Sequence, residues 1–350
     1  MHSQNNTRKE ILVFLKDQGI NFIEDFDLKK KSWLKAGGTF EVFIQPNNLI
    51  QIKQILEFLK KNETKFQVVG NLSNIIFRDG KIRTPIINLK YYDQIKIIET
   101  VEDSINIEVG SGISIFKFVN FVSNNLKISC LEGLVGIPGS LGGAIYMNAS
   151  SYGSFVSEYL KEVQIINQNC ELIKLKKDDL KLEWRSTIFH KMKNFVILNM
   201  IFEFPKKNIS TLETINNKIQ KIKNHRMKFQ EKKFPNLGSL FATKDLYSDI
   251  SKTSITYYLL NKTNRILSKI ILKLFNENLL LFYRKILVKI YSFFFNVTKN
   301  DSFILSDRTI NCLINKGSPH ANDAIKVIRK IQKKIKYSQR LENIIVDEID

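Results

Sequence analysis

Cysteine and histidine are scarce in this sequence. Its 350 residues include 3 cysteines and 4 histidines. Cys130, Cys170 and Cys312 lie far apart along the chain, and no C-x-x-C pair occurs. A disulfide framework typically uses an even set of cysteines and a zinc site needs closely spaced ligands, so neither is indicated. We therefore expect a protein of a reducing compartment that binds no metal ion.

Long apolar runs are also missing. A membrane span needs about 20 mostly apolar residues, and lysine, arginine, asparagine or glutamate interrupts each apolar run of residues 256–297. Residues 1–10 contain no apolar core of the kind found in signal peptides. These two features lead us to expect a cytoplasmic protein without a transmembrane span.

Acidic residues are outnumbered by basic ones. Lys and Arg number 54 against 34 Asp and Glu, a formal net charge of +20. Such a balance favours an anionic partner: a nucleotide diphosphate, a nucleic acid or an anionic membrane surface. A base-composition bias in the gene would also enrich the chain in lysine, isoleucine and asparagine. No zinc-finger, RNA-binding or arginine-rich motif occurs, so we do not expect nucleic-acid binding.

Residues 132–149 hold the most informative pattern. Five glycines and one proline fall within 133–143. Glycine permits positive φ and lets another group approach the main chain, and successive N–H groups in such turns form a concave anion site. A diphosphate fits such a site, although a tight turn between packed elements has a similar composition. The order G-x-x-G-x-x-G-G differs from the G-x-G-x-x-G of dinucleotide-binding folds, and no P-loop motif occurs.

Apolar periodicity predicts the interleaved helices and strands of an α+β protein. Helices are expected at 8–18, 49–61, 113–124, 206–233 and 320–337. Strands are expected at 40–44, 66–69, 84–89, 95–100, 105–109, 163–167, 170–174 and 195–203. Residues 256–297 predict a basic amphipathic helical pair, which either packs inward with a solvated lysine face or lies on a membrane surface.

The segment 136–149, with G-I-P-G-S-L-G-G-A followed by M-N-A, closely resembles the flavin-diphosphate loop of UDP-N-acetylenolpyruvoylglucosamine reductases. Other segments resemble this family in the same order along the chain, namely 34–38, 68–74, 184–189, 226–239 and 305–317. Leu72 stands where the family has the second glycine of G-x-G-S-N. The resemblance covers roughly residues 32–244 and 303–335.

The resemblance implies an α+β protein with the two-subdomain FAD-binding fold of the vanillyl-alcohol-oxidase type and a C-terminal α/β substrate domain. We expect an N-terminal helical segment at 1–31, the FAD-binding domain at 32–204 and the substrate domain at 205–350, with a divergent basic helical segment at 256–297. FAD is the implied cofactor and NADPH the implied reductant. The residues expected to bind FAD are Gly70, Asn71, Leu72, Ser73, Asn74, Gly136, Ile137, Pro138, Gly139, Ser140, Gly142, Gly143, Asn148 and Tyr152.

The family reduces UDP-N-acetylglucosamine enolpyruvate to UDP-N-acetylmuramate, a cytoplasmic step of peptidoglycan precursor synthesis and hence of cell-wall biogenesis. Hydride is added at the vinyl carbon and a proton at the neighbouring carbon. The negative charge that develops needs a cation, which the motif position assigns to Arg185, while Ser239 matches the family's proton donor. Glu342 is the candidate for the family's third catalytic residue, a glutamate. We expect a monomer whose partner is a small nucleotide sugar.

The C-terminal part departs from the family. Ala242 and Thr243 replace a lysine and an asparagine, and an isoleucine in 341–344 stands where the family's L-E-P-E has its catalytic acid. Glu342 and Glu348 are the two candidates to replace that acid. Two alternatives therefore stay open: a paralogous flavoprotein with a different nucleotide-sugar substrate, and a non-catalytic FAD-binding protein that uses its basic helices to bind a partner or a membrane.

Overall fold

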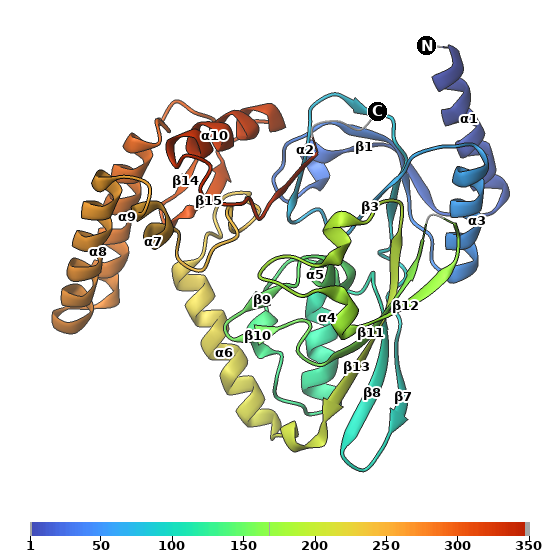
Figure 1. Cartoon of the computed structure of the whole chain (residues 1–350), viewed down its shortest axis with the longest axis horizontal. Helices are drawn as coiled ribbons and strands as arrows, with labels where there is room; N and C mark the ends of the chain where they lie inside the picture. Colours follow the sequence, from blue (N-terminus) through green and yellow to red (C-terminus); the bar gives the residue numbers. More distant parts are fainter. Residues whose placement is uncertain (1, 168, 347–350) are drawn as a thin grey trace.

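Two β-sheets carry the first part of the chain in the computed structural model, which describes residues 2–167 and 169–346 (Figure 1). The first sheet has the order β1-β2-β6-β3, with β5 also paired to β2. Strands β1 and β2 are antiparallel, whereas β6 runs parallel to both β2 and β3. The strands are β1 (Phe22–Asp27), β2 (Thr39–Ile44), β3 (Gln67–Val69), β5 (Lys81–Ile82) and β6 (Ile86–Asn88).

Helix α3 (Leu49–Lys61) makes the crossover from β2 to β3. Strands that point the same way need such a crossover, because the end of one lies at the opposite edge from the start of the next. The Asn48 side chain caps the helix by accepting the N–H of Gln51 at 2.9 Å. The apolar face of α3, which includes Ile55 and Leu59, packs with residues of α1 (His2–Asp17) and β2 in one buried cluster.

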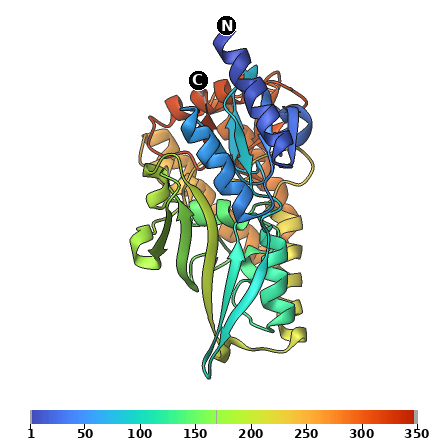
Figure 2. The same cartoon turned by 90° about the vertical axis from the view of Figure 1, so that its right-hand side faces the viewer.

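The second sheet has the order β12-β11-β13-β8-β7 and is antiparallel throughout. Helices α4 (Ile115–Asn120) and α5 (Leu141–Tyr146) share a buried cluster with its inner face, where Phe118, Phe202 and Phe204 are fully buried. Figure 2 shows the β7–β8 hairpin extending from this sheet, away from α1. The strands are β7 (Ile95–Thr100), β8 (Ser104–Gly110), β11 (Leu160–Ile166), β12 (Leu172–Lys176) and β13 (Val196–Pro205).

Shorter elements connect these layers. They are α2 (Leu28–Lys31), β4 (Ile75–Phe77), a π-helical turn at Phe121–Asn125, β9 (Ser150–Ser151), β10 (Ser154–Phe155), and 3-10 turns at Glu132–Leu134, Lys177–Leu180, Ile188–Lys191 and Lys206–Asn208. The glycine-rich segment therefore runs between the 3-10 turn at Glu132–Leu134 and α5, over the inner face of the second sheet.

Helix α6 (Leu212–Phe229) leads from the second sheet to the C-terminal part (Figure 1). One apolar cluster holds that part together, with Tyr291, Phe295, Ile328 and Ile331 fully buried in it. The final strand, β16 (Ile344–Val346), then pairs in parallel with β4 of the first part. The other elements are α7 (Leu246–Ser251), α8 (Ile255–Leu274), α9 (Glu277–Phe294), β14 (Phe303–Ser306), β15 (Thr309–Asn315) and α10 (Ala321–Lys334).

Most predicted elements are confirmed. The helix at 49–61 is α3, and the basic helical pair is α8 and α9. The pattern missed β1, because its charged residues interrupt the apolar alternation. The helix expected from 206 is wrong at its start, since a 3-10 turn comes first and Thr211 caps α6 by accepting the N–H of Thr214 at 3.2 Å. The domain limits stay a prediction.

Within residues 2–167 and 169–346, no helix combines the length and the apolar content needed to cross a bilayer.

Asn315, at the end of β15, connects the C-terminal part to the loop before β2. Its Nδ2 donates to the main-chain oxygens of Leu34 at 2.9 Å and Ser318 at 2.8 Å. Its Oδ1 accepts the N–H groups of Gly317 and Ser318, both at 2.8 Å. Because the side chain is 3% exposed, water cannot replace these bonds.

We expect Asn315→Leu to lower the free energy of unfolding by about 3 kcal/mol, since it leaves several buried main-chain groups without partners. Urea denaturation followed by circular dichroism measures the loss. Asn217→Leu, on the exposed side of α6, is the matched control and should change stability by no more than about 0.5 kcal/mol. A loss as small as that of the control would show that Asn315 does not hold these segments together.

Candidate functional site

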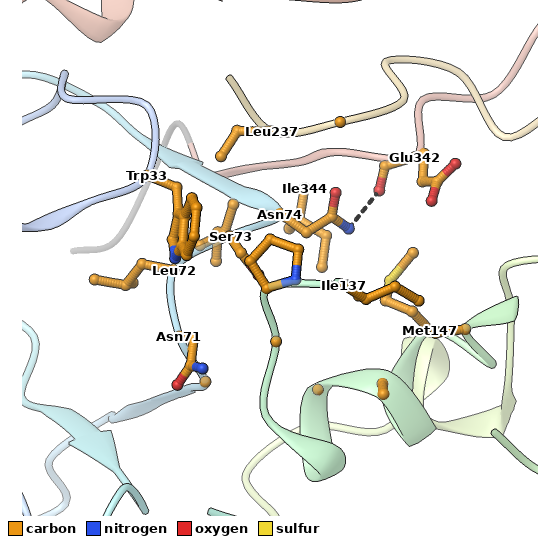
Figure 3. A pocket seen from close by; sticks show the side chains of 18 of the residues that line it. Trp33, Asn71, Leu72, Ser73, Asn74, Ile137, Met147, Leu237, Glu342 and Ile344 are labelled. Carbon is orange, nitrogen blue, oxygen red and sulfur yellow. Dashed lines mark hydrogen bonds between the residues drawn. The ribbon is translucent and has the colours of Figure 1, made fainter. Parts of the chain in front are cut away.

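One large cavity lies where the two sheets meet the C-terminal part. Its volume is about 1580 Å³, whereas a pocket for one drug-sized ligand is on the order of 300–1,000 Å³. Figure 3 shows Leu237 on one side of it, and Ile137 of the glycine-rich segment and Met147, directly after α5, on the other. The cavity has room for a large cofactor and a second ligand together.

Loop 70–74, directly after β3, lines this cavity. No hydrogen bond within the described part of the chain uses the main-chain N–H of Asn71, Leu72 or Ser73. The loop is nevertheless held firmly, because Nδ2 of Asn88 donates to the main-chain oxygen of Gly70 at 2.8 Å. Its N–H groups are therefore positioned to bind an anion in the cavity.

Leu72 occupies a main-chain conformation that favours glycine. Its φ is 53°, in the left-handed region that residues with a side chain rarely adopt. The leucine side chain is buried in a cluster with Val69 and Phe77, and this burial offsets the strain. The structure thus explains how a leucine can stand where related sequences have glycine.

The glycine-rich segment 136–143 uses most of its N–H groups within the protein. Gly139 donates to the oxygen of Ile137 at 3.1 Å, and Gly143 donates to Oγ of Ser140 at 3.3 Å. The N–H groups of Leu141 and Gly142 donate to the oxygens of Ile113 and Ser111, at 2.8 and 2.9 Å. Within the described residues, unused N–H groups at adjacent positions lie in loop 70–74, and the role of segment 136–143 in binding a diphosphate stays a prediction.

Gly142 is required by close packing. An added Cβ would lie 2.7 Å from Cβ of Ser111 and 3.2 Å from its main-chain oxygen, closer than real contacts allow. At Gly143 the nearest neighbour of an added Cβ is Oγ of Ser140, at 3.3 Å. Gly142 therefore lets α5 approach the turn after β8, whereas a Cβ at Gly143 would need only a small shift of the Ser140 hydroxyl.

Arg185 is held in the cavity wall by Ser150 of β9. Its Nη1 donates to Oγ of Ser150 and its Nη2 to the main-chain oxygen of Ser150, both at 2.9 Å. The residue has a φ of 55°, and Nη2 of Arg340 stabilises this strained turn by donating to the oxygens of Trp184 and Arg185 at 2.9 and 3.0 Å. A guanidinium has five N–H donors, so Arg185 keeps N–H groups for a ligand.

Glu342 lies beside Arg185, with Oε1 2.8 Å from Nε in an ion pair whose two side chains are largely buried. Its main chain is fixed as well: the oxygen accepts Nδ2 of Asn74 at 3.0 Å (Figure 3), and the N–H donates to Leu240 at 2.9 Å. Burial raises the pKa of Glu342 above its usual range, and the adjacent guanidinium of Arg185 opposes that shift.

Ser239 completes the group of predicted catalytic residues that line the cavity. It is exposed on the cavity side, and its main-chain oxygen accepts Nδ2 of Asn343 at 3.1 Å. Arg185, Ser239 and Glu342, from three distant parts of the sequence, therefore meet in one wall. Glu348, the other candidate acid, lies outside the described residues.

Two of the residues expected to bind FAD do not line the cavity among the described residues, namely Asn148 and Tyr152. Nδ2 of Asn148 donates to the oxygen of Glu183 at 2.9 Å, and its Oδ1 accepts the hydroxyl of Ser157 at 2.6 Å. The hydroxyl of Tyr152 bonds Nδ1 of His225 at 2.7 Å. Both side chains brace the neighbouring turns. The other residues expected to bind FAD do line the cavity.

Arg226 was not among the predicted site residues, yet it lines the cavity and is 6% exposed. Its Nη2 donates to the oxygen of Gly133 at 3.0 Å and to Oγ of Ser151 at 2.7 Å. Helix α6 thereby contacts the 3-10 turn at Glu132–Leu134, which precedes the glycine-rich segment. The sequence signal was the position of Arg226 in the last turn of a helix inside a family-like segment, but only the fold shows which segment it contacts.

We expect Gly142→Ala to lower the melting temperature even without cofactor, because its Cβ collides with Ser111. Gly143→Ala is the matched variant in the same helix and should melt within a few degrees of the parent, with alanine's helix propensity in its favour by about 1 kcal/mol. Differential scanning calorimetry of the FAD-free proteins makes the comparison. Equal melting of the two variants would contradict the packing role of Gly142.

The raised pKa of Glu342 predicts a pH dependence of stability. The folded state holds this proton more tightly than the unfolded chain, so the contribution of Glu342 to stability is present at low pH and is lost as the pH rises through the raised pKa. We expect the free energy of unfolding of the parent to fall relative to that of Glu342→Gln as the pH rises from the ordinary glutamate pKa of 4.5 toward neutral pH. Urea titrations across this range test it, and a constant difference would contradict it.

Comparison with known proteins identifies the family of this chain. Residues 40–176 match the family model described as FAD binding domain. The UDP-N-acetylenolpyruvoylglucosamine reductase of Listeria monocytogenes is 33% identical over 216 residues, which cover 61% of this chain and 68% of the relative. The enzyme of the same name from Staphylococcus aureus is 31% identical over 217 residues, covering 62% and 67%.

A solved structure shows the same fold. UDP-N-acetylenolpyruvylglucosamine reductase from Thermus caldophilus aligns with a TM-score of 0.62 at 17% identity, over 93% of this chain and 98% of that chain. Its fold, the matched FAD-binding domain and the sequence relatives agree with one another. The chain belongs to the UDP-N-acetylenolpyruvoylglucosamine reductase family of FAD-dependent oxidoreductases.

Proposed function

We propose that this chain reduces UDP-N-acetylglucosamine enolpyruvate to UDP-N-acetylmuramate in peptidoglycan precursor synthesis. The observation that supports it most is the ion pair between Arg185 and Glu342, 2.8 Å apart, in the same cavity as Ser239 and loop 70–74. The names of the relatives point to the same reaction. The cavity also has the size for a dinucleotide cofactor and a sugar nucleotide together.

Loop 70–74 is our proposed diphosphate site. The unused N–H groups of Asn71, Leu72 and Ser73 fit phosphate oxygens, and Gly136–Ser140 supplies the opposite wall. Bound FAD would supply the hydride chemistry, with NADPH as its reductant. In this proposal Asn148 and Tyr152 do not contact the cofactor. Their hydrogen bonds stabilise the turns next to the site.

The catalytic residues have separate tasks in this reaction. Arg185 binds the substrate carboxylate with the N–H groups that Ser150 leaves unused, and so stabilises the negative charge at the carbon that bears it. The Ser239 hydroxyl donates a proton to that carbon. Glu342 positions the guanidinium through the ion pair.

A second candidate, a different nucleotide-sugar substrate, is favoured by the replaced residues near Ser239. Ala242 has no polar group, and the hydroxyl of Thr243 donates to the carboxylate of Asp249. Lys244, however, lines the cavity with its Nζ 5.1 Å from the ring centre of Trp184, and it can supply a cation to the substrate. Chromatographic identification of the product formed from the enolpyruvyl sugar nucleotide decides between the two substrates.

We expect Ser239→Ala to leave flavin reduction by NADPH unchanged and to slow reoxidation by the enolpyruvyl substrate by about 100-fold or more, the usual contribution of a positioned acid. Stopped-flow absorbance of the flavin separates the two half-reactions. Ser338→Ala, an exposed serine outside the cavity, is the control. If both variants reoxidise at the rate of the parent, Ser239 is not the proton donor.

A further inference from the structure

The hairpin formed by α8 and α9, residues 255–294, exposes two rows of apolar side chains. In α8 the row consists of Ile255, Leu259, Ile266, Ile270 and Leu274. In α9 it consists of Leu279, Phe282, Ile286, Ile290 and Phe293. Phe282 and Phe293 are 61% and 77% exposed, so these side chains are not part of the core.

Helical geometry places each row on one side of its helix, and in α8 Lys262 and Thr263 separate Leu259 from Ile266. At 100° per residue, the five positions in each helix fall within a sector of about 100°. The buried residues Tyr257 and Asn261 of α8 lie on the opposite side of that helix. In α9 the buried residues Leu287 and Tyr291 occupy another sector. Each helix therefore has one face for the protein and a separate apolar face for something outside it.

Basic side chains border the apolar rows. The hairpin contains seven lysines and arginines but only one acidic residue, Glu277. Lys262 and Lys269 are exposed at the edge of the row of α8, Lys273 is exposed within its sector, and Lys289 is exposed beside the row of α9. A helix whose outer face is only a solvated lysine face would carry no exposed apolar row. A helix that only packs inward would bury its apolar side chains.

Buried side chains and polar contacts attach the hairpin to the rest of the protein. Leu287, Val288 and Tyr291 are buried in the cluster of the C-terminal part. The Arg284 guanidinium lies over the Phe229 ring of α6, 4.9 Å from its centre, and Lys228 forms an ion pair with Glu277. Figure 1 shows α8 and α9 at the outer edge of the C-terminal part, opposite α1 and α3. The apolar rows of the hairpin are therefore already exposed in the folded protein.

We propose that the α8–α9 hairpin binds to the surface of membranes that contain anionic phospholipids. Apolar rows bordered by lysines are typical of helices that lie at the boundary between headgroups and acyl chains. Each lysine near an anionic surface adds attraction. A second copy of the chain fits less well, because it would bring two strongly basic hairpins together. The charge complementarity therefore selects an anionic lipid surface.

Cosedimentation of the FAD-loaded full chain with vesicles tests this proposal. We expect the protein to pellet with vesicles of phosphatidylcholine and phosphatidylglycerol, and to stay in solution with phosphatidylcholine alone or at high salt. The combined variant Ile266→Gln, Ile270→Gln, Phe282→Gln and Phe293→Gln should lower the partition coefficient by about 100-fold or more. Lys262→Gln, Lys269→Gln and Lys273→Gln together should lower it by about 100-fold.

A matched control uses exposed apolar residues elsewhere. Ile50 and Phe116 are 70% and 61% exposed, and Ile50→Gln with Phe116→Gln should leave vesicle binding unchanged. The proposal is overturned if the parent binds no better to anionic than to zwitterionic vesicles. It is also overturned if the control variant loses as much binding as the hairpin variant, or if sedimentation velocity shows that the rows hold two copies together.

A single substitution keeps the test valid if the combined variant does not fold. Phe282→Trp places an indole at an exposed position of α9. We expect its emission to shift to the blue with anionic vesicles and to be quenched by brominated phosphatidylglycerol, beyond the signal of the unsubstituted chain. Unchanged emission overturns the proposal. None of these measurements depends on turnover, so the proposed reaction can fail while membrane binding holds.

Discussion

One extended segment, residues 340–346, connects the separate parts of the chain that line the cavity. Arg340 binds the turn of Arg185, and Glu342 forms an ion pair with its guanidinium. Asn343 donates to Oδ1 of Asn74 at 2.7 Å and to the oxygen of Ser239 at 3.1 Å. The pairing of β16 with β4 then ends the segment in the first part of the protein. Without this segment, the predicted catalytic residues would not be held next to one another.

The glycine-rich segment and loop 70–74 divide the work of a cofactor site. The first supplies close packing, because the N–H groups of Leu141 and Gly142 are bound to the turn after β8. The second keeps its N–H groups unused and faces the cavity. A glycine-rich pattern alone does not distinguish these two uses, since both need a main chain without side chains in the way.

The C-terminal part combines a family-like role with a feature of its own. Its β14–β15 hairpin and α10 carry Asn315 and the apolar cluster that supports the cavity wall. The α8–α9 hairpin shares that cluster on one side and exposes apolar rows on the other. The prediction that this hairpin packs inward is therefore confirmed for Leu287 and Tyr291. It is wrong for Ile266 and Phe293, whose side chains are exposed to solvent.

The amino-acid sequence by itself determined the elements and the family. Apolar periodicity predicted α3 and the α8–α9 pair, because local spacing decides which face of a helix is buried. Motifs in order predicted the FAD-binding domain, and all of the residues expected to bind FAD except Asn148 and Tyr152 line the cavity. The sequence also marked Arg185 and Ser239, because each lies within a contiguous motif.

Only the tertiary structure decided how these residues meet. The partnership of Glu342 with Arg185 depends on the path of the last strand, which no local pattern encodes. The same holds for Arg226 against Gly133 and for the choice of N–H donors in loop 70–74. Such contacts join residues that are distant in sequence, and their geometry is set by packing of the whole chain.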